Sequence, residues 1–215
     1  MARLRSVPDR RAEYRLQAAG YALIAGIDEA GRGPLAHKVV AAAVILPARF
    51  RRRGIDDSKR LSATKREQLA ALIKAEALAW AIGEASVAEI DELNILQATR
   101  LAALRAVRAL DPAPHALLLD ALLLDVELPQ LSMVRADAQC LVVAAASILA
   151  KVHRDHLMQE AELLYPGYGF AQHKGYPTRE HLAALHILGP SPIHRRTFAP
   201  VRALLHTYNN DTIED

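Results

Sequence analysis

Apolar runs that end in acidic residues mark the first half of the chain. Residues 21–27 are almost entirely apolar, which is typical of a strand buried on both faces, and Asp28 and Glu29 follow directly. A second apolar run, residues 39–46, comes after a short loop, so the two runs predict a strand hairpin. Residues 116–119 form a further apolar run that ends at Asp120. Two buried strands that end in acids point to a functional site.

The rest of the pattern alternates strands with helices. We expect strands at residues 80–87 and 132–135. Ser86 and Glu89 have the spacing of a capping box, which predicts a long amphipathic helix that ends before residue 111.

Helical periodicity dominates the last third of the chain. Asp137 is expected to open a helix through residue 150 toward 164, and Thr178 to cap a helix that Gly189 ends. The prediction is an α/β fold, with a mixed β-sheet flanked by helices and a small helical C-terminal appendage. Its expected divisions are a main domain at residues 1–164, with a peripheral first segment of about 20 residues, a helical subdomain at 165–207 and a frayed tail at 208–215.

Composition places the chain among globular proteins. It has 215 residues, of which 52% are hydrophobic, enough for one substantial core. The longest apolar stretch without a charge, residues 140–150, is far shorter than the roughly 20 residues of a membrane span. Asp9 and Glu13 speak against a signal or transit peptide, so a cytoplasmic location without a membrane segment is expected. The single cysteine, Cys140, is expected to be a buried apolar residue.

Basic residues are concentrated rather than abundant. The net charge is only +3, although the pI of about 9.1 makes nucleic-acid binding worth considering. Either of the two basic groups alone is more typical of a solvated surface. The first comprises Arg49, Arg51, Arg52, Arg53, Lys59, Arg60, Lys65 and Arg66, and the second His173, Lys174, Arg179, His194, Arg195 and Arg196.

Asp28 and Glu29 allow two interpretations. Neighbouring side chains on a regular strand point to opposite faces, so a shared site requires the strand to twist or end there. Gly31 and Gly33 permit such a change and a close approach of a ligand to the backbone. For the acidic pair alone, a hairpin with exposed charged residues is the favoured interpretation.

Three further acids could join this site. Asp120 and Asp125 each follow three leucines, and the pattern does not decide which of them faces the site; each could instead cap a turn. Asp137 can be a helix N-cap, a metal ligand or both. Clustered carboxylates raise one another's pKa unless cations bind, which is the condition that a two-metal site satisfies.

Other kinds of site have little support. His153 and His156 flank Arg154 and Asp155, which favours a solvated helix surface over a metal site. No zinc-binding pattern of cysteine and histidine is present. The Gly31-Arg32-Gly33 segment lacks the third glycine of a dinucleotide fingerprint, and no Walker lysine follows it, so no nucleotide cofactor is expected.

Five motifs resemble those of ribonuclease HII, the prokaryotic type 2 ribonuclease H, and the resemblance extends from about Leu23 to Val201. The motifs occur in the family's order. They are the segments at residues 28–34 (DEAGRGP), 57–59 (DSK), 92–96 (ELNIL), 144–151 (AAASILAK) and 173–178 (HKGYPT).

The resemblance implies a ribonuclease H-like fold and a metal-dependent endonuclease. Its implied substrates are RNA–DNA hybrids and duplex DNA that contains single ribonucleotides, with Mn²⁺ or Mg²⁺ as cofactor, two ions during catalysis. By position, Asp28, Glu29, Asp120 and Asp137 match the family's metal-binding acids, whereas Asp125 matches a position that is not catalytic. The 165–207 subdomain would complete the substrate groove, and the enzyme is expected to act as a monomer.

Nucleic-acid contacts also follow from the resemblance. Gly31, Arg32 and Gly33 match the loop that contacts the ribose 2′-hydroxyl, and Tyr176 matches the tyrosine that packs at the cleavage junction, with Tyr168 as the alternate. Candidates for phosphate contacts are Lys59, Arg195 and Arg196. Three residues depart from the common family pattern, namely His37, Lys38 and Ala136.

Two other functions compete with this one. A non-catalytic protein that binds hybrid duplexes would use the same basic clusters but would not need four acids. Another two-metal nuclease of the same fold, such as a resolvase, would share the acids but would not need a loop that senses a 2′-hydroxyl. The motifs favour the ribonuclease.

Overall fold

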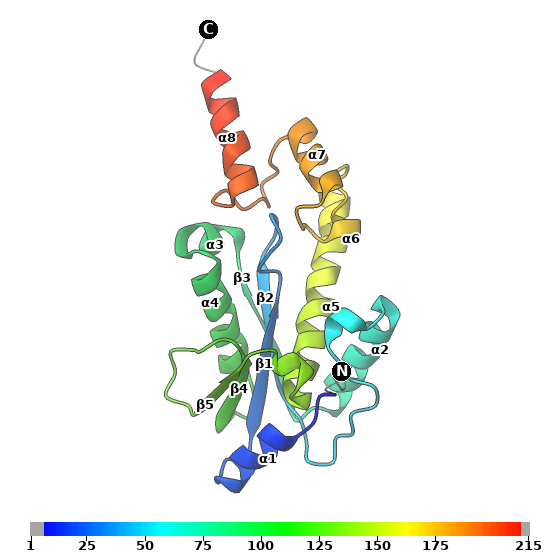
Figure 1. The fold of residues 1–215 in the computed structure, drawn as a ribbon, viewed down its shortest axis with the longest axis vertical. Helices are drawn as coiled ribbons and strands as arrows, with labels where there is room; N and C mark the ends of the chain where they lie inside the picture. Colours follow the sequence, from blue (N-terminus) through cyan, green and yellow to red (C-terminus); the bar gives the residue numbers. More distant parts are fainter. Residues whose placement is uncertain (1–6, 212–215) are drawn as a thin grey trace, which may run out of the picture. The chain divides into compact units, whose positions relative to one another are not determined.

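The computed structural model describes the backbone of residues 7–211 and the side chains of residues 7–206. Five strands form one sheet in the order β3-β2-β1-β4-β5 (Figure 1). Their bounds are β1 Ile24–Ala30, β2 Val39–Ile45, β3 Ala79–Ala85, β4 Ala116–Asp120 and β5 Gln130–Met133. The predicted hairpin is confirmed, since β1 pairs antiparallel with β2, and β1–β4 and β4–β5 are parallel. The sheet is therefore mixed, as expected.

Helices and short 3₁₀ turns connect and cover the strands. The α-helices are α1 Arg11–Ala18, α2 Ala63–Glu76, α3 Val87–Leu93, α4 Ile95–Arg108, α5 Leu141–Leu164, α6 Phe170–His173, α7 Arg179–Leu188 and α8 Ala199–Asp211, and the 3₁₀ turns are η1 Ser58–Arg60 and η2 Ala136–Ala138. Among the described residues no helix combines the length and hydropathy of a membrane span.

Two compact units are distinguishable. The first comprises residues 1–30, 40–84 and 99–152, and the second residues 31–39, 85–98 and 153–215. The predicted divisions at residues 164 and 207 stay a prediction. The predicted tail, residues 208–215, overlaps the end of α8, and its last four residues lie outside the described part of the chain.

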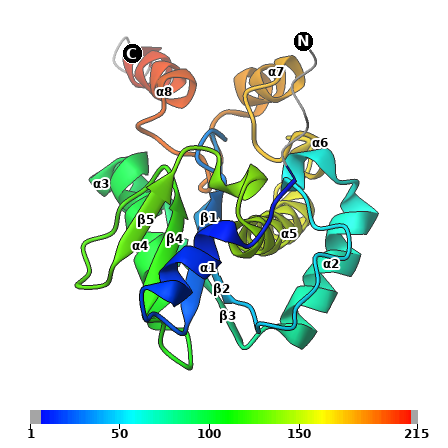
Figure 2. The ribbon, with the colours of Figure 1, turned by 60° about the horizontal axis from the view of Figure 1, so that its bottom comes forward.

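In the first unit, the sheet lies between helices. Figures 1 and 2 show α4 on one side of the sheet and the beginning of α5 on the other, with α2 beside α5. Close backbone approach requires glycine at both contacts. A Cβ atom on Gly26 of β1 would lie 2.5 Å from the carbonyl oxygen of Val142 in α5, and one on Gly83 of β3 would overlap the carbonyl oxygen of Ala102 in α4. The fully buried strand β2 and the four buried apolar residues of β4 complete this core.

The second unit has its own apolar core. It is built from the 31–39 loop, the later part of α5, and α6 to α8. The fully or almost fully buried members are Leu35, Ala36, Met158, Ala161, Tyr168, Phe170, Leu185 and Val201. The predicted cap of α7 is confirmed: the Thr178 side chain accepts a hydrogen bond from the His181 N–H, and Gly189 ends the helix at φ 73°.

Several predicted boundaries were wrong. Strand β1 continues through Asp28 and Glu29, because both residues pair with β2, opposite Ala42 and Ala41. The helix expected after the capping box is two helices, α3 and α4. Asn94 separates them at φ 71°, and its side chain accepts hydrogen bonds from the first turn of α4.

Four other expectations also need correction. Asp137 is not the N-cap of the long helix, since it lies in η2 and α5 begins at Leu141. Strand β5 ends at Met133, two residues earlier than expected, and strand β3 gives way to α3 at Val87. Arg154 and Asp155 are buried and not part of a solvated helix surface.

Candidate active site

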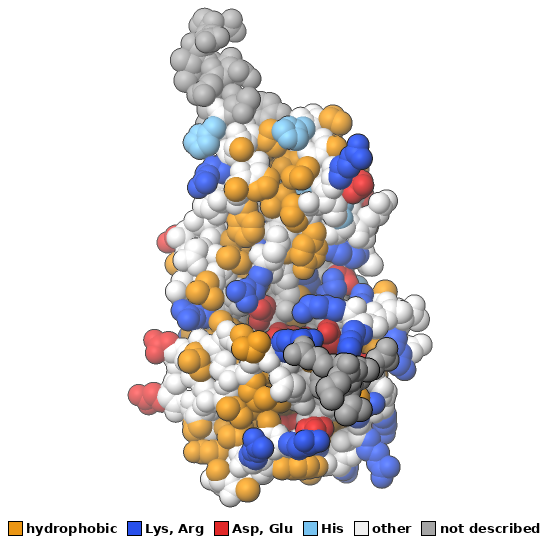
Figure 3. Space-filling model, viewed as in Figure 1, with side chains coloured by type: hydrophobic (Ala, Val, Ile, Leu, Met, Phe, Trp, Pro, Cys, Tyr) orange, Lys and Arg blue, Asp and Glu red, His pale blue; other side chains and the backbone are white. Residues whose placement is uncertain are grey.

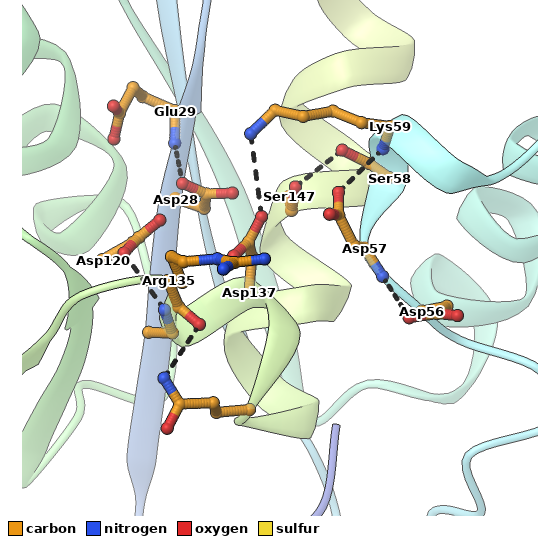
Figure 4. A network of polar contacts seen from close by, with 12 residues as sticks. Asp28, Glu29, Asp56, Asp57, Ser58, Lys59, Asp120, Arg135, Asp137 and Ser147 are labelled. Carbon is orange, nitrogen blue, oxygen red and sulfur yellow. Dashed lines mark hydrogen bonds and ion pairs between the residues drawn. The ribbon is translucent and has the colours of Figure 1, made fainter. Parts of the chain in front are cut away.

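Strand β1 presents Asp28 and Glu29 on opposite sides, as the alternation of a strand requires. Asp28 is 7% exposed, and its Oδ1 accepts a hydrogen bond of 2.9 Å from the Glu29 N–H. Figure 4 shows the Asp28 carboxylate on the side of Asp120 and Asp137, while the Glu29 side chain extends away from them. The side chains of Asp28 and Glu29 therefore point in different directions.

Asp120 lies beside Asp28 because β4 is parallel to β1. The two strands are in register at Ile27 and Leu119, so the two aspartates come one residue later on neighbouring strands. The Asp120 Oδ1 also accepts a 3.0 Å hydrogen bond from the Ala136 N–H, which ties η2 to the end of β4. Asp125, in contrast, is exposed in the loop after β4.

Asp137 completes the group from η2. Its side chain is buried, and its Oδ2 lies 3.8 Å from Nζ of Lys59, whose side chain is 80% exposed. Burial raises the pKa of Asp137, and Asp57 and Asp120 raise it further, while Lys59 lowers it. Partial burial lowers the pKa of Lys59, but the neighbouring acids, Asp137 first and then Asp57, Asp28 and Asp120, together raise it by more. Lys59 is therefore a protonated, positively charged side chain next to Asp137.

Asp28 has a strongly perturbed carboxyl group. Its pKa lies well above the usual value because burial penalises the charged form and because Glu29 and Asp137 are negative. Hydrogen bonds from the Ser147 hydroxyl and the Glu29 N–H oppose this shift. Ser147 in turn lies 2.8 Å from the Ser58 hydroxyl, so α5 and η1 both support Asp28. Sequence reasoning missed both serines, although they lie within two of the recognised motifs.

The acids fit a divalent cation in their chemistry. All four supply carboxylate oxygens, the donors that Mg²⁺ and Mn²⁺ prefer, and a cation would relieve the repulsion that raises the pKa of Asp28. Among residues 7–206, however, no three histidine, cysteine, aspartate or glutamate side chains already stand as a ligand set. Metal binding by all four acids therefore requires their side chains to change conformation. Glu29 must change most, because its side chain extends away from the other acids.

Basic side chains accompany the acids in the first unit. On the face drawn in Figure 3, acidic side chains are exposed near the middle with Lys and Arg side chains beside them, and further basic side chains cover the loop before α2. That loop belongs to the basic segment of residues 49–66 noted in the sequence. The arrangement can attract a polyanion to the acids.

In the second unit, the loop of residues 31–33 contacts Tyr176. A Cβ atom on Gly33 would lie 3.2 Å from Cε1 of Tyr176, so the absence of a side chain lets the ring approach the backbone. Tyr176 is 46% exposed, whereas Tyr168 is 8% exposed and donates a hydrogen bond of 2.6 Å to the Gly189 carbonyl. Of the two candidate tyrosines, only Tyr176 offers its ring to a ligand.

Arg195 and Arg196 have different environments. Arg195 is fully buried, and its guanidinium donates to the carbonyls of Gly31, Arg32, Pro34 and His37. Burial and the neighbouring Arg154 lower its pKa to about 9. Arg196 is exposed, and its backbone N–H donates to Asp91. Only Arg196 of this pair has a side chain open to a phosphate.

Arg154 is a second buried arginine that sequence reasoning missed. Its Nη2 donates a 2.9 Å hydrogen bond to the Ala36 carbonyl, and a Cβ atom on Gly31 would overlap its Nε. Gly31 has a φ of 97°, so this position needs glycine for its backbone as well as for space. The arginine-aspartate pair in a helix otherwise rich in alanine was the available signal.

Comparison with known proteins decides the family. The family model for ribonuclease HII matches residues 25–201. The chain belongs to this family. A ribonuclease HII of Desulfitobacterium hafniense is 59% identical over 196 residues, which is 91% of this chain and 75% of that protein. One of Geobacillus kaustophilus is 55% identical over 195 residues, with the same coverage of both chains.

Solved structures agree with this assignment. The crystal structure of the ribonuclease H2 from Pyrococcus horikoshii is similar with a TM-score of 0.73 and 28% identity, over 87% of this chain and 99% of that one. The fold of this ribonuclease HII is thus ribonuclease H-like, as predicted. Members of the family are metal-dependent nucleases of the ribonuclease H type that act on RNA-containing nucleic acid. The chain is accordingly an enzyme, and the non-catalytic alternative is set aside.

Proposed function

We propose that this ribonuclease HII cuts the RNA strand of RNA–DNA hybrids and cuts 5′ of single ribonucleotides embedded in duplex DNA. The products would be a 3′-hydroxyl and a 5′-phosphate. The observation that carries the proposal is the group of acids at the ends of β1 and β4 and in η2, in which Asp28 and Asp137 are buried and have raised pKa values. Such a group has little use without cations and a phosphate to act on.

The divalent ions would be held by Asp28, Glu29, Asp120 and Asp137. Two ions would be bound during catalysis. When bound, Mg²⁺ or Mn²⁺ activates the attacking water and stabilises the leaving oxygen. The hydroxyl of Ser147 and the N–H of Glu29 orient Asp28. The N–H of Ala136 orients Asp120.

Several residues would bind the substrate. Lys59 supplies an exposed ammonium group near Asp137, suited to a phosphate of the cleaved strand. Arg196 is exposed and can contact a phosphate at a second point. The backbone of residues 31–33 would test for a 2′-hydroxyl, and the exposed ring of Tyr176 would pack on the sugar at the junction. Arg195, being buried, would position the loop instead of contacting the phosphate proposed for it.

The test is a cleavage assay on duplex DNA that carries one ribonucleotide and an end label. Wild type, Asp28→Asn and the matched control Asp125→Asn are compared in Mg²⁺, in Mn²⁺ and in chelator. We expect one cut on the 5′ side of the ribonucleotide with wild type and Asp125→Asn, only with metal, and no cut with Asp28→Asn. Cleavage in chelator, undiminished cleavage by Asp28→Asn, or binding without cleavage in either metal would contradict the proposal.

Tyr176→Ala tests the ribose sensor. Removal of the ring should reduce the preference for a ribonucleotide-containing duplex over all-DNA duplex by about tenfold, or about 1.4 kcal/mol, because the packing contact with the ribose is lost. Affinity for all-DNA duplex should change little. The control is Tyr14→Ala, an exposed tyrosine of α1. Equal losses of affinity for both duplexes would remove Tyr176 from the sensor.

A further inference from the structure

Three histidines of the second unit lie together beneath Tyr176. His181 and His194 are buried, and their Nε2 atoms are 3.1 Å apart. The ring of His173 stacks on that of His181, with centroids 4.3 Å apart and an angle of 15° between the planes. The roles proposed for the acids and for the loop of residues 31–33 do not involve these histidines. The histidine cluster therefore requires a separate explanation.

The hydrogen bonds specify where each proton sits. The backbone N–H of Ser191 lies 2.9 Å from Nδ1 of His194, so this nitrogen must accept, and the proton of a neutral His194 is on Nε2. That proton is donated to Nε2 of His181, which places the proton of His181 on Nδ1. The Nδ1–H then donates to the carbonyl of Tyr176, 2.9 Å away.

Both rings are therefore neutral, and each uses one nitrogen as a donor and the other as an acceptor. A second proton on His181 would sit on Nε2 and point at the Nε2–H of His194. A second proton on His194 would sit on Nδ1 and point at the Ser191 N–H. Burial is consistent with this arrangement, since it lowers the pKa of His181 and lowers that of His194 to about 4. His173 is satisfied separately, by the Tyr168 carbonyl and the Gly175 N–H.

Arg195, the residue after His194, binds the loop of residues 31–37, which is the other part of the proposed ribose sensor. The backbone of residues 193–195 bridges that of residues 35–37, with an N–H···O bond of 2.7 Å from His37 to Ile193 and one of 2.8 Å from Arg195 to Leu35. Successive side chains of an extended segment point in opposite directions. His194 thus reaches toward Tyr176, while the guanidinium of Arg195 binds the loop carbonyls at 2.6–3.1 Å.

We propose that the His194-Arg195 dipeptide is a two-sided brace that positions the ribose-sensing elements of the enzyme. His194, acting through the fixed tautomer of His181, holds the backbone of Tyr176, and Arg195 holds the loop of residues 31–37. Both are positioning residues and touch no substrate. This inference rests on the proposed function, because it assumes that Gly33 and Tyr176 sense the ribose.

The first experiment measures ribose preference as a ratio of dissociation constants. Duplex DNA with and without one ribonucleotide is titrated with each protein in Ca²⁺, so that the readout is binding and not turnover. His194→Phe keeps an aromatic ring of similar size but removes the hydrogen bonds to Ser191 and His181, and Arg195→Lys keeps the charge but not the four contacts. Matched controls are His186→Phe and Arg202→Lys, at exposed positions of α7 and α8.

We expect the ratio to fall about fivefold in each brace variant, as for the loss of one hydrogen bond of about 1 kcal/mol, with unchanged affinity for all-DNA duplex. His194→Gln, which retains an N–H donor, should recover part of the loss. An unchanged ratio, or an equal loss of affinity for both duplexes, overturns the brace. A wild type without ribose preference would instead overturn the proposed function.

The second experiment does not depend on folded variants. The ¹⁵N chemical shifts of the histidine rings in the wild-type protein at pH 7 report each tautomer directly. We expect the Nδ1–H tautomer for His181 and the Nε2–H tautomer for His194. A charged His181, or the same tautomer in both residues, would overturn the proposed role of His194 in the brace, whatever the binding data show.

Discussion

Asp28 illustrates a conflict between stability and function at the scale of one residue. Its carboxylate is buried beside Glu29 and near Asp137, and the three charges oppose one another without a cation. The Ser147 hydroxyl, the Glu29 N–H and the nearby charge of Lys59 favour the ionised form but do not outweigh the burial and the repulsion. The metal-free protein therefore keeps an unfavourable charge at the place where catalysis needs one.

Replacement of this charge should separate the two effects. In chelator, Asp28→Asn should raise the free energy of unfolding by about 1 kcal/mol, because the amide keeps the shape of the group but removes the repulsion. Mn²⁺ should raise the melting temperature of the wild type, and the same change should abolish both this rise and cleavage. Thermal melts with and without Mn²⁺ check this. A less stable variant in chelator would show that the hydrogen bonds outweigh the repulsion.

Lys59 makes a different prediction, because its side chain is 80% exposed. Lys59→Gln should change the free energy of unfolding by less than about 0.5 kcal/mol, as for other exposed ion pairs. It should lower the slope of log affinity against log salt concentration by about 1, if the ammonium contacts one phosphate. The control is Lys65→Gln, an exposed lysine of α2. Equal slopes for wild type and Lys59→Gln would exclude the phosphate contact.

At the scale of elements, the packing of β1 on α5 positions the acids. The backbone of β1 lies so close to the start of α5 that only glycine fits at position 26. Asp28 follows two residues later, and Ser147 lies on the same helix as Val142. The strand-helix contact thus determines how Asp28 meets Ser147. A change in this contact should affect stability and catalysis together.

Gly26→Ala tests this contact. The added methyl group would lie 2.5 Å from the Val142 carbonyl oxygen, so the strand and helix must separate. We expect a loss of about 2–3 kcal/mol in the free energy of unfolding and a lower kcat. Gly20→Ala is the comparison, since no atom lies within 4 Å of its Cβ and only its φ of 98° opposes the change. Equal destabilisation of the two variants would mean that space at Gly26 is not the limiting factor.

At the scale of the whole molecule, two groups of side chains give stability opposite dependences on pH. The raised pKa values of Asp28 and Asp137 mean that the folded protein takes up their protons at a higher pH than the unfolded chain, so acid relieves an unfavourable charge. The lowered pKa values of His181 and His194 act the other way. Below pH 6.5 the unfolded chain binds protons that the folded protein excludes.

His194→Phe isolates the histidine contribution. In wild type, the stability that depends on neutral His194 is complete above its unfolded pKa near 6.5 and falls as the pH approaches about 4. The variant lacks this group, so the difference in free energy of unfolding between the proteins should shrink by up to about 3 kcal/mol from pH 7 to pH 4. Denaturant titrations in chelator at several pH values measure it. A difference that does not vary with pH would mean that His194 titrates normally when folded.

Local patterns predicted most elements but not all of their ends. Apolar runs and cap residues identified the hairpin, β4, and helix α7 with its Thr178 cap. The ends were missed where a long-range contact or the backbone conformation of one residue overrides the local pattern. Pairing with β2 carries β1 through two charged residues, and the left-handed Asn94 divides a helix whose periodicity continues on both sides.

Sequence by itself determined that buried strands end in acids, and its motifs identified the family, because burial of apolar runs and the order of motifs are properties of the chain alone. Only the tertiary structure decided which candidates share an environment. It placed Asp120 and not Asp125 beside Asp28, exposed Tyr176 but buried Tyr168, and buried Arg195 while leaving Arg196 exposed. The physical reason is that each of these outcomes depends on partner atoms far away in sequence: a parallel strand, a close glycine, or backbone carbonyls that can satisfy a buried guanidinium.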